Sequence, residues 1–187
     1  MEELKSCLRS GESLLWSGQP NKVTAMDAQY KSGIVKKIIV ALVLVAVFCG
    51  AYIAVCTKNG TELKAGLIVI IAAIGAYVII SPFTDAKKLS SKYYYGITDQ
   101  RLLIKTDKCR SAEYSHIANA QFVTDAAGET SLLINKAVEE GKKGNIRVLA
   151  VTCINKDDTD FEENAVMYAI PDAAAVKAIL KEYVTFS

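Results

Sequence analysis

The sequence predicts a membrane α-helical hairpin followed by a mainly antiparallel β domain, with about seven strands in an open barrel capped by a C-terminal helix. Three observations predict this class. Two runs of 19 residues contain no charged side chain. After them, short segments rich in aromatic and β-branched residues alternate with polar turns. The chain then ends on a segment whose apolar residues repeat with helical spacing.

The two charge-free runs are residues 38–56 and 65–83. They hold 33 hydrophobic residues out of 38, whereas the other 149 residues carry all 42 charges. A helix of this length spans about 28 Å, which is close to the roughly 30 Å hydrocarbon core of a bilayer. Two helices buried in a soluble core are the alternative, but so short a chain could not surround both. We therefore expect two membrane spans.

The link between the runs, residues 57–64, contains the turn signal Asn59-Gly60. Eight residues can join only antiparallel neighbours, so the spans form a hairpin. We expect three parts. These are an N-terminal cytoplasmic segment, the two-helix hairpin and the β domain, at residues 1–34, 35–83 and 88–187.

Lysines are more numerous beside the outer ends of the predicted hairpin than in the loop between its two spans. Six lie outside the spans and only two lie between them. An excess of basic residues marks the cytoplasmic side, so both termini are expected in the cytoplasm. The flanking lysines nearest the spans are Lys36, Lys37, Lys87 and Lys88.

Small residues recur every four positions on one face of the first span, at Ala46, Gly50 and Ala54. Small residues at this spacing let helix backbones approach closely. The stripe could close the hairpin or join two copies of the chain. It could also reflect only the general abundance of Ala and Gly in membrane helices.

The β domain is predicted from period-two patterns and turn residues. Its last segment changes period at Pro171-Asp172, where Asp172 is a suitable helix N-cap. Val176 and Leu180 then lie on one apolar stripe that must pack on the strands. The predicted strands are residues 93–97, 102–105, 113–117, 118–124, 131–135, 145–154 and 163–170.

Residue types that carry chemistry are sparse. The five cysteines form no CxxC pair, and in a cytoplasmic setting we expect them to be free thiols. The single histidine, His116, has no metal-spaced partner and is expected to be structural, so we expect no metal and no cofactor. From Thr84 onward the chain has 14 basic and 15 acidic residues. That near-neutral balance disfavours nucleic-acid binding.

Two short motifs resemble those of the bacterial pleckstrin-homology-like (PH-like) family of membrane proteins. One is the opening GESLLWSGQP at residues 11–20, and the other is YGITDQRLLI at residues 95–104. The resemblance implies a PH-like barrel, a place in the plasma membrane of a bacterium and mainly structural roles for the motif residues. Those residues are Gly11, Glu12, Trp16, Gly18, Pro20, Tyr95, Thr98, Arg101 and Leu102.

We therefore expect a membrane-anchored binding or scaffold module that contacts protein partners, lipid headgroups or copies of itself, without catalysis. The hairpin itself contacts membrane lipids. Phosphoinositide binding is not expected, because the first hairpin turn is Thr-Asp-Gln, with only Arg101 and Lys105 nearby. One alternative is a homo-oligomeric membrane assembly. A membrane enzyme or transporter component is the other, although neither span contains an ionisable residue of the kind that transport requires.

Overall fold

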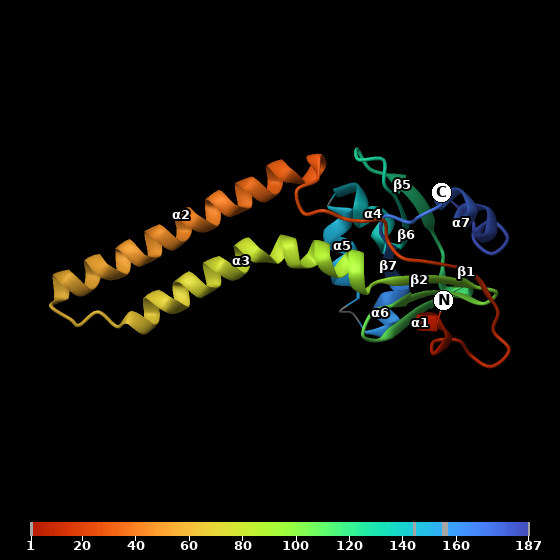
Figure 1. Ribbon diagram of the computed structural model, residues 1–187, viewed down its shortest axis with the longest axis horizontal. Coiled ribbons are helices and arrows are strands. Elements are labelled where there is room, and N and C mark those ends of the chain that lie inside the picture. Colours follow the sequence, from red (N-terminus) through yellow and green to blue (C-terminus); the bar gives the residue numbers. More distant parts are fainter. Residues whose placement is uncertain (1, 144, 155–156, 187) are drawn as a thin grey trace. The chain divides into compact units, whose positions relative to one another are not determined.

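A computed structural model of the chain describes residues 2–143, 145–154 and 157–186 (Figure 1). The chain divides into two compact units. The sheet unit contains Met1–Val23 together with Lys87–Ser187, and the hairpin unit is Thr24–Ala86. Part of the predicted N-terminal segment therefore belongs to the same unit as the C-terminal half of the chain.

Two long helices make up the hairpin, α2 (Ala28–Asn59) and α3 (Ala65–Lys92). Both are long and apolar enough to cross a membrane, which supports membrane association. Large apolar side chains are exposed along both helices, with Phe48 at 59% and Ile74 at 61%. Surfaces of this kind are unfavourable in water and favourable in lipid.

The first helix ends at the predicted turn. Gly60 has a left-handed φ of 61°, where a side chain would be strained. Its N–H donates to the carbonyl of Thr57, and the N–H of Thr61 donates to that of Cys56. This pair of hydrogen bonds satisfies carbonyls at the helix end that would otherwise lack partners.

The close approach of the two helices involves a different small residue from the predicted stripe. A Cβ on Gly75 of α3 would lie 2.3 Å from Cγ2 of Val45 on α2. By contrast, a Cβ on Gly50 would meet nothing within 4 Å. Ala46, Gly50 and Ala54 are all exposed. The interpretation that this stripe closes the hairpin is therefore wrong, because the three residues do not face α3.

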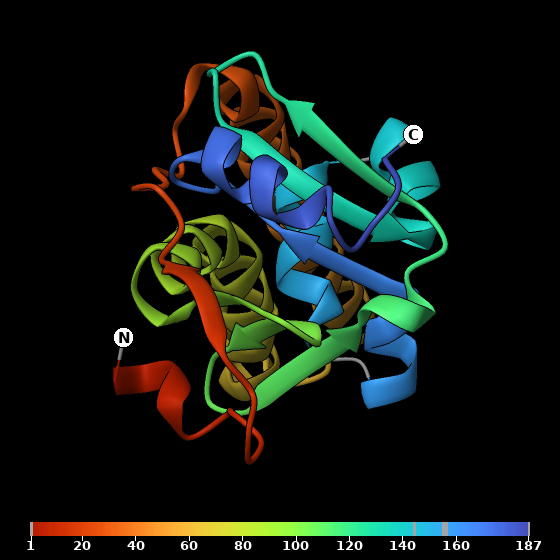
Figure 2. The same ribbon diagram turned by 90° about the vertical axis from the view of Figure 1, so that its right-hand side faces the viewer.

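The sheet unit contains two antiparallel sheets, shown in Figure 2. The first has the order β1-β2-β3-β4, and its edge strand β1 precedes the hairpin in sequence. The second has the order β5-β6-β7, and the two sheets do not close into a barrel. The strands are β1 (Leu14–Gly18), β2 (Tyr94–Thr98), β3 (Arg101–Lys105), β4 (Cys109–Glu113), β5 (Ala120–Thr124), β6 (Thr130–Asn135) and β7 (Asn164–Met167).

Two predicted strands are wrong, and β1 was not predicted. Residues 145–154 form mainly helix α5 (Ile146–Cys153), because the Asn145 side chain accepts hydrogen bonds from the N–H groups of Arg147 and Val148. This cap and a buried helical face override the strand propensity of its β-branched residues. Residues 113–117 contain the 3-10 helix η1 (Tyr114–His116), and the strand there, β4, lies earlier.

Short helices complete the sheet unit. As predicted, Asp172 caps the last one, α7 (Ala173–Leu180), by accepting from the N–H of Ala175, and Val176 and Leu180 are buried. The others are α1 (Glu2–Lys5), α4 (Lys136–Lys143) and α6 (Asp158–Glu163).

A buried tyrosine joins the two sheets. The hydroxyl of Tyr95 on β2 donates to the carbonyl of Tyr168, 3.1 Å away, and accepts from the N–H of the same residue at 2.9 Å. Tyr168 directly follows β7, so this pair of bonds links the two sheets through the core. Burial raises the pKa of the Tyr95 hydroxyl well above its usual range, so the group stays protonated.

The hairpin contact predicts opposite results for two matched glycine substitutions. Gly75→Leu should destabilise the helix pair by about 1–3 kcal/mol, because Val45 is β-branched and has little rotamer freedom to move aside. Gly50→Leu should change stability by less than about 0.5 kcal/mol. Thermal unfolding of the detergent-solubilised chains, followed by helical circular dichroism, measures both. Equal melting temperatures for the two variants would contradict the observed contact.

Candidate functional site

A tight turn brings a carboxylate from the N-terminal segment into the sheet unit. The N–H of Glu12 donates to the carbonyl of Arg9 at 3.1 Å, and Gly11 adopts a left-handed φ of 82°. Glycine suits this position because it has no Cβ to clash. The N–H of Arg9 donates to Oε2 of Glu12 at 2.7 Å. The turn thereby fixes the Glu12 side chain, which is fully buried.

The β2–β3 hairpin supplies the partners of this carboxylate. Arg101 donates from Nε to Oε1 of Glu12 and from Nη2 to Oε2, both at 2.8 Å. This two-point geometry is the strongest form of carboxylate–guanidinium contact. The Thr98 hydroxyl lies 2.8 Å from Oε1 and donates to it. It also accepts from the N–H of Arg101, which tightens the hairpin turn.

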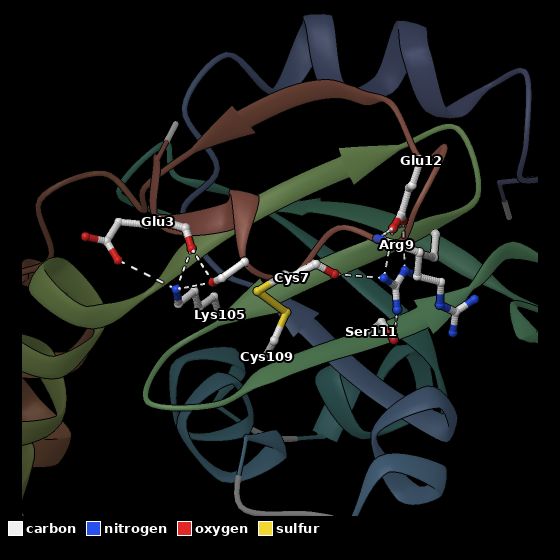
Figure 3. Close-up of a disulfide and its surroundings, with 9 residues drawn as sticks. Glu3, Cys7, Arg9, Glu12, Lys105, Cys109 and Ser111 are labelled. Atoms are coloured by element: carbon white, nitrogen blue, oxygen red, sulfur yellow. Dashed lines mark hydrogen bonds and ion pairs between the residues drawn. A yellow bond between two sulfur atoms is a disulfide. The ribbon is translucent and has the colours of Figure 1, made fainter.

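Arg101 also ties together three segments that are distant in sequence, and its partners Cys7, Glu12 and Ser111 are labelled in Figure 3. Besides Glu12, it donates to the carbonyl of Cys7 at 2.9 Å and to the hydroxyl of Ser111 at 3.1 Å. Cys7 follows α1, and Ser111 lies on β4. One guanidinium therefore holds the N-terminal segment, the β2–β3 hairpin and β4 in a fixed arrangement. We call Glu12, Thr98, Arg101 and Ser111 the buried polar cluster.

A disulfide lies beside the buried polar cluster. Cys7 and Cys109 are bonded, with their Cα atoms 5.9 Å apart, within the usual range for such bridges. The prediction that all cysteines are free is therefore wrong for this pair. Spacing along the chain could not reveal it, because 102 residues separate the two and β1 was not predicted. Cys49, Cys56 and Cys153 form no disulfide among the described residues.

Electrostatics keep the Glu12–Arg101 pair ionised at neutral pH. Hydrogen bonds from Arg101 are the main reason that the pKa of Glu12 falls from 4.5 to about 2, and the Arg9 N–H and the Thr98 hydroxyl add to this. Burial acts in the opposite direction and is outweighed. The Glu12 carboxylate in turn raises the pKa of Arg101.

The hydrogen bonding of Glu12 leaves it no spare capacity for catalysis. A carboxylate has about four acceptor sites, and Glu12 accepts four hydrogen bonds from Arg101, Thr98 and Arg9. A catalytic base needs a free lone pair that faces substrate. The arrangement is that of a structural lock between the N-terminal segment and the sheet.

The motif residues that do not belong to the buried polar cluster also lie in the sheet unit. Tyr95 joins the sheets, Leu102 is buried in the core and Pro20 is buried after β1. Trp16 and Gly18 lie on β1, where a Cβ on Gly18 would come within 2.7 Å of the Trp16 ring. Glycine is therefore the residue that this packing accommodates.

The predicted membrane-flanking lysines lie on the two long helices. Lys36 and Lys37 are on α2, and Lys87 and Lys88 are near the end of α3. Sequence reasoning missed Cys7 and Ser111 as hydrogen-bond partners of Arg101, and it missed Cys109 as the disulfide partner of Cys7. One signal was present, because Glu12 is the only charged residue of the first motif and the second motif contains Arg101, a residue of opposite charge.

The described residues hold no group of three or more His, Cys, Asp and Glu side chains that could bind a metal ion. His116 lies on η1, with Nδ1 2.8 Å from Oε2 of Glu162 in a solvent-exposed pair.

No protein-family model, curated protein or solved structure matches this chain.

The buried polar cluster predicts a large loss of stability for Glu12→Gln. Removing one partner of a buried ion pair costs about 3–5 kcal/mol, because the remaining charge stays buried without compensation. Trp16 is the only tryptophan and lies on β1, so its fluorescence during denaturant unfolding of the detergent-solubilised chain reports on this unit. Glu113→Gln is the matched control. Its exposed pair with Arg9 should contribute much less.

The same variants should differ in their dependence on pH. The folded-state pKa of Glu12 lies below its ordinary 4.5, so its stabilisation is complete above pH 4.5 and is lost as pH falls toward 2. Glu12→Gln should flatten the stability profile in that window, and Glu113→Gln should retain most of the slope. A parent profile that is flat between pH 4.5 and 2 would contradict the assigned ionisation.

Proposed function

We propose that this chain is a membrane-anchored binding or scaffold module with no catalytic role. One observation carries the proposal. The α2–α3 hairpin exposes apolar side chains along its length, whereas in the sheet unit the buried charges of Glu12 and Arg101 bond to each other. An anchor joined to a rigid unit suits a protein that holds a partner at a membrane surface.

Several features support a PH-like architecture for the sheet unit. The described residues contain seven strands, all paired in antiparallel fashion, and α7 packs a buried apolar stripe at the end of the chain. The sequence motifs that resemble the family meet in the buried polar cluster. The departures are three helices, α4 to α6, between β6 and β7, and two sheets that do not close into a barrel.

Partner binding by the sheet unit can be tested at its surface. Two of its large hydrophobic residues are exposed, Leu15 on β1 at 42% and Val148 on α5 at 54%. A photocrosslinking amino acid at either position, in the full chain in native membranes, should give a discrete protein adduct. The same amino acid at buried Leu103 is the control and should give none. Absence of an adduct at both exposed positions would argue against a protein-binding module.

We further propose that both termini face the cytoplasm. The lysine distribution around the spans supports this orientation. The Cys7–Cys109 disulfide opposes it, because reducing conditions keep most cytoplasmic thiols unpaired. The lysine excess carries the proposal, because flanking basic residues act during insertion itself.

Labelling of the hairpin turn tests the orientation. Thr61 is exposed in the turn between α2 and α3. A membrane-impermeant maleimide applied to intact cells should label Thr61→Cys, because the turn would then face the exterior. The parent chain provides the background from its own thiols. Labelling only after lysis would place the turn in the cytoplasm and reverse the orientation.

A further inference from the structure

A groove runs between α2 and α3 within the hairpin unit. Its volume is about 560 Å³, within the range of small-molecule sites in proteins. The lining is almost entirely aliphatic or aromatic. Two lysines, Lys36 and Lys37, are the exceptions.

Small residues create this hollow. Ala41 on α2 and Gly75 on α3 line the groove and are buried, which is typical of residues at its floor. Phe48 and Ile74 also line it but remain about 60% exposed, as expected for walls. The groove is therefore open to the medium around the hairpin rather than enclosed within it.

The length of the groove matches one leaflet of a bilayer. Along α2 it extends from Lys36 to Phe48, which is about 18 Å at a rise of 1.5 Å per residue. Half of a hydrocarbon core of roughly 30 Å is about 15 Å. An acyl chain whose headgroup lies level with the lysines would therefore reach the far end of the groove.

The charge at the lysine end has no acidic partner among the groove's described lining residues. The Lys37 ammonium donates to the hydroxyl of Ser81 on α3 at 3.1 Å, which holds it at this end without neutralising it. Asp85 lies one turn further along α3 and forms no ion pair with either lysine in the described contacts. The end therefore presents two positive charges.

We propose that this groove binds one anionic phospholipid, with its phosphate at Lys36 and Lys37 and one acyl chain along the apolar floor. Basic pockets between membrane helices bind such headgroups by charge and hydrogen bonding. A second copy of the hairpin fits less well, because its apolar surface would cover both ammonium groups without supplying an anion. The inference rests on membrane insertion of the hairpin, which belongs to the proposed function.

Fluorescence quenching by brominated lipids tests the site in the full chain. Phe48→Trp places a reporter at the far end of the groove, and the parent chain gives the background from Trp16. The protein is reconstituted in phosphatidylcholine vesicles that contain a minor fraction of mid-chain-brominated phosphatidylglycerol or brominated phosphatidylcholine. The brominated anionic lipid should be preferred by roughly 30-fold, because each of the two lysines contributes about fivefold, or about 1 kcal/mol.

Matched charge variants separate the groove from general surface attraction. Lys36→Gln with Lys37→Gln, in the reporter chain, should abolish the preference. Lys87→Gln with Lys88→Gln removes the same charge outside the groove and should keep it. All four lysines are exposed, so neither pair should prevent folding.

Each other outcome overturns the proposal in a distinguishable way. Equal quenching by the two lipids, or a preference that survives Lys36→Gln with Lys37→Gln, excludes the anionic site while leaving the anchor intact. Protein that floats with vesicles but is quenched by neither lipid has its groove covered by protein, such as a second copy. Protein that does not float fails at membrane insertion, which removes the proposed function as well.

Discussion

The sheet unit depends on the two-point contact between Glu12 and Arg101. It joins a segment that precedes the hairpin to a strand pair that follows it, across 89 positions in the sequence. A buried pair of this kind adds little net stability compared with apolar packing, but breaking it is costly. Its value is specificity, because few other arrangements satisfy four acceptor sites on the carboxylate and the donors of the guanidinium together. The Thr98 hydroxyl supplies a further donor to the carboxylate, and the Cys7 carbonyl supplies a further acceptor to the guanidinium. The neighbouring disulfide joins the same N-terminal segment to β4 by a covalent link.

The parts of the fold that the sequence predicted are those with a strong local signal. Charge-free runs marked the hairpin, Asn59-Gly60 marked its turn, and Asp172 with Val176 and Leu180 marked the last helix. The failures come from tertiary context. Residues 146–153 have β-branched side chains that favour a strand, yet the Asn145 cap and the burial of Ala150 and Cys153 hold them in a helix. β1 was missed because its partner strand lies beyond the hairpin.

The sequence indicated which residues make up the candidate site, but it did not indicate that they lie together in the fold. Both motifs drew attention to Glu12, Thr98 and Arg101, whereas nothing local showed that the three would meet. Cys7 and Cys109 were harder still, because pairing between cysteines is a property of the folded chain rather than of spacing. The groove between α2 and α3 is likewise a product of packing. Gly75 carries no signal beyond being a small residue in a span, and the more regular stripe at Ala46, Gly50 and Ala54 faces elsewhere.

The position of β1 has a consequence for how this protein is made. The strand pairs with β2, although the whole hairpin lies between them in the chain. During synthesis β1 emerges first and must wait, unpaired, until both spans have been translated and β2 follows. If only one span entered the bilayer, β1 and β2 would lie on opposite sides and could not pair. If the hairpin spans a membrane as proposed, completion of the sheet acts as a check on insertion, since only chains with both ends of the hairpin on one side can form the native edge.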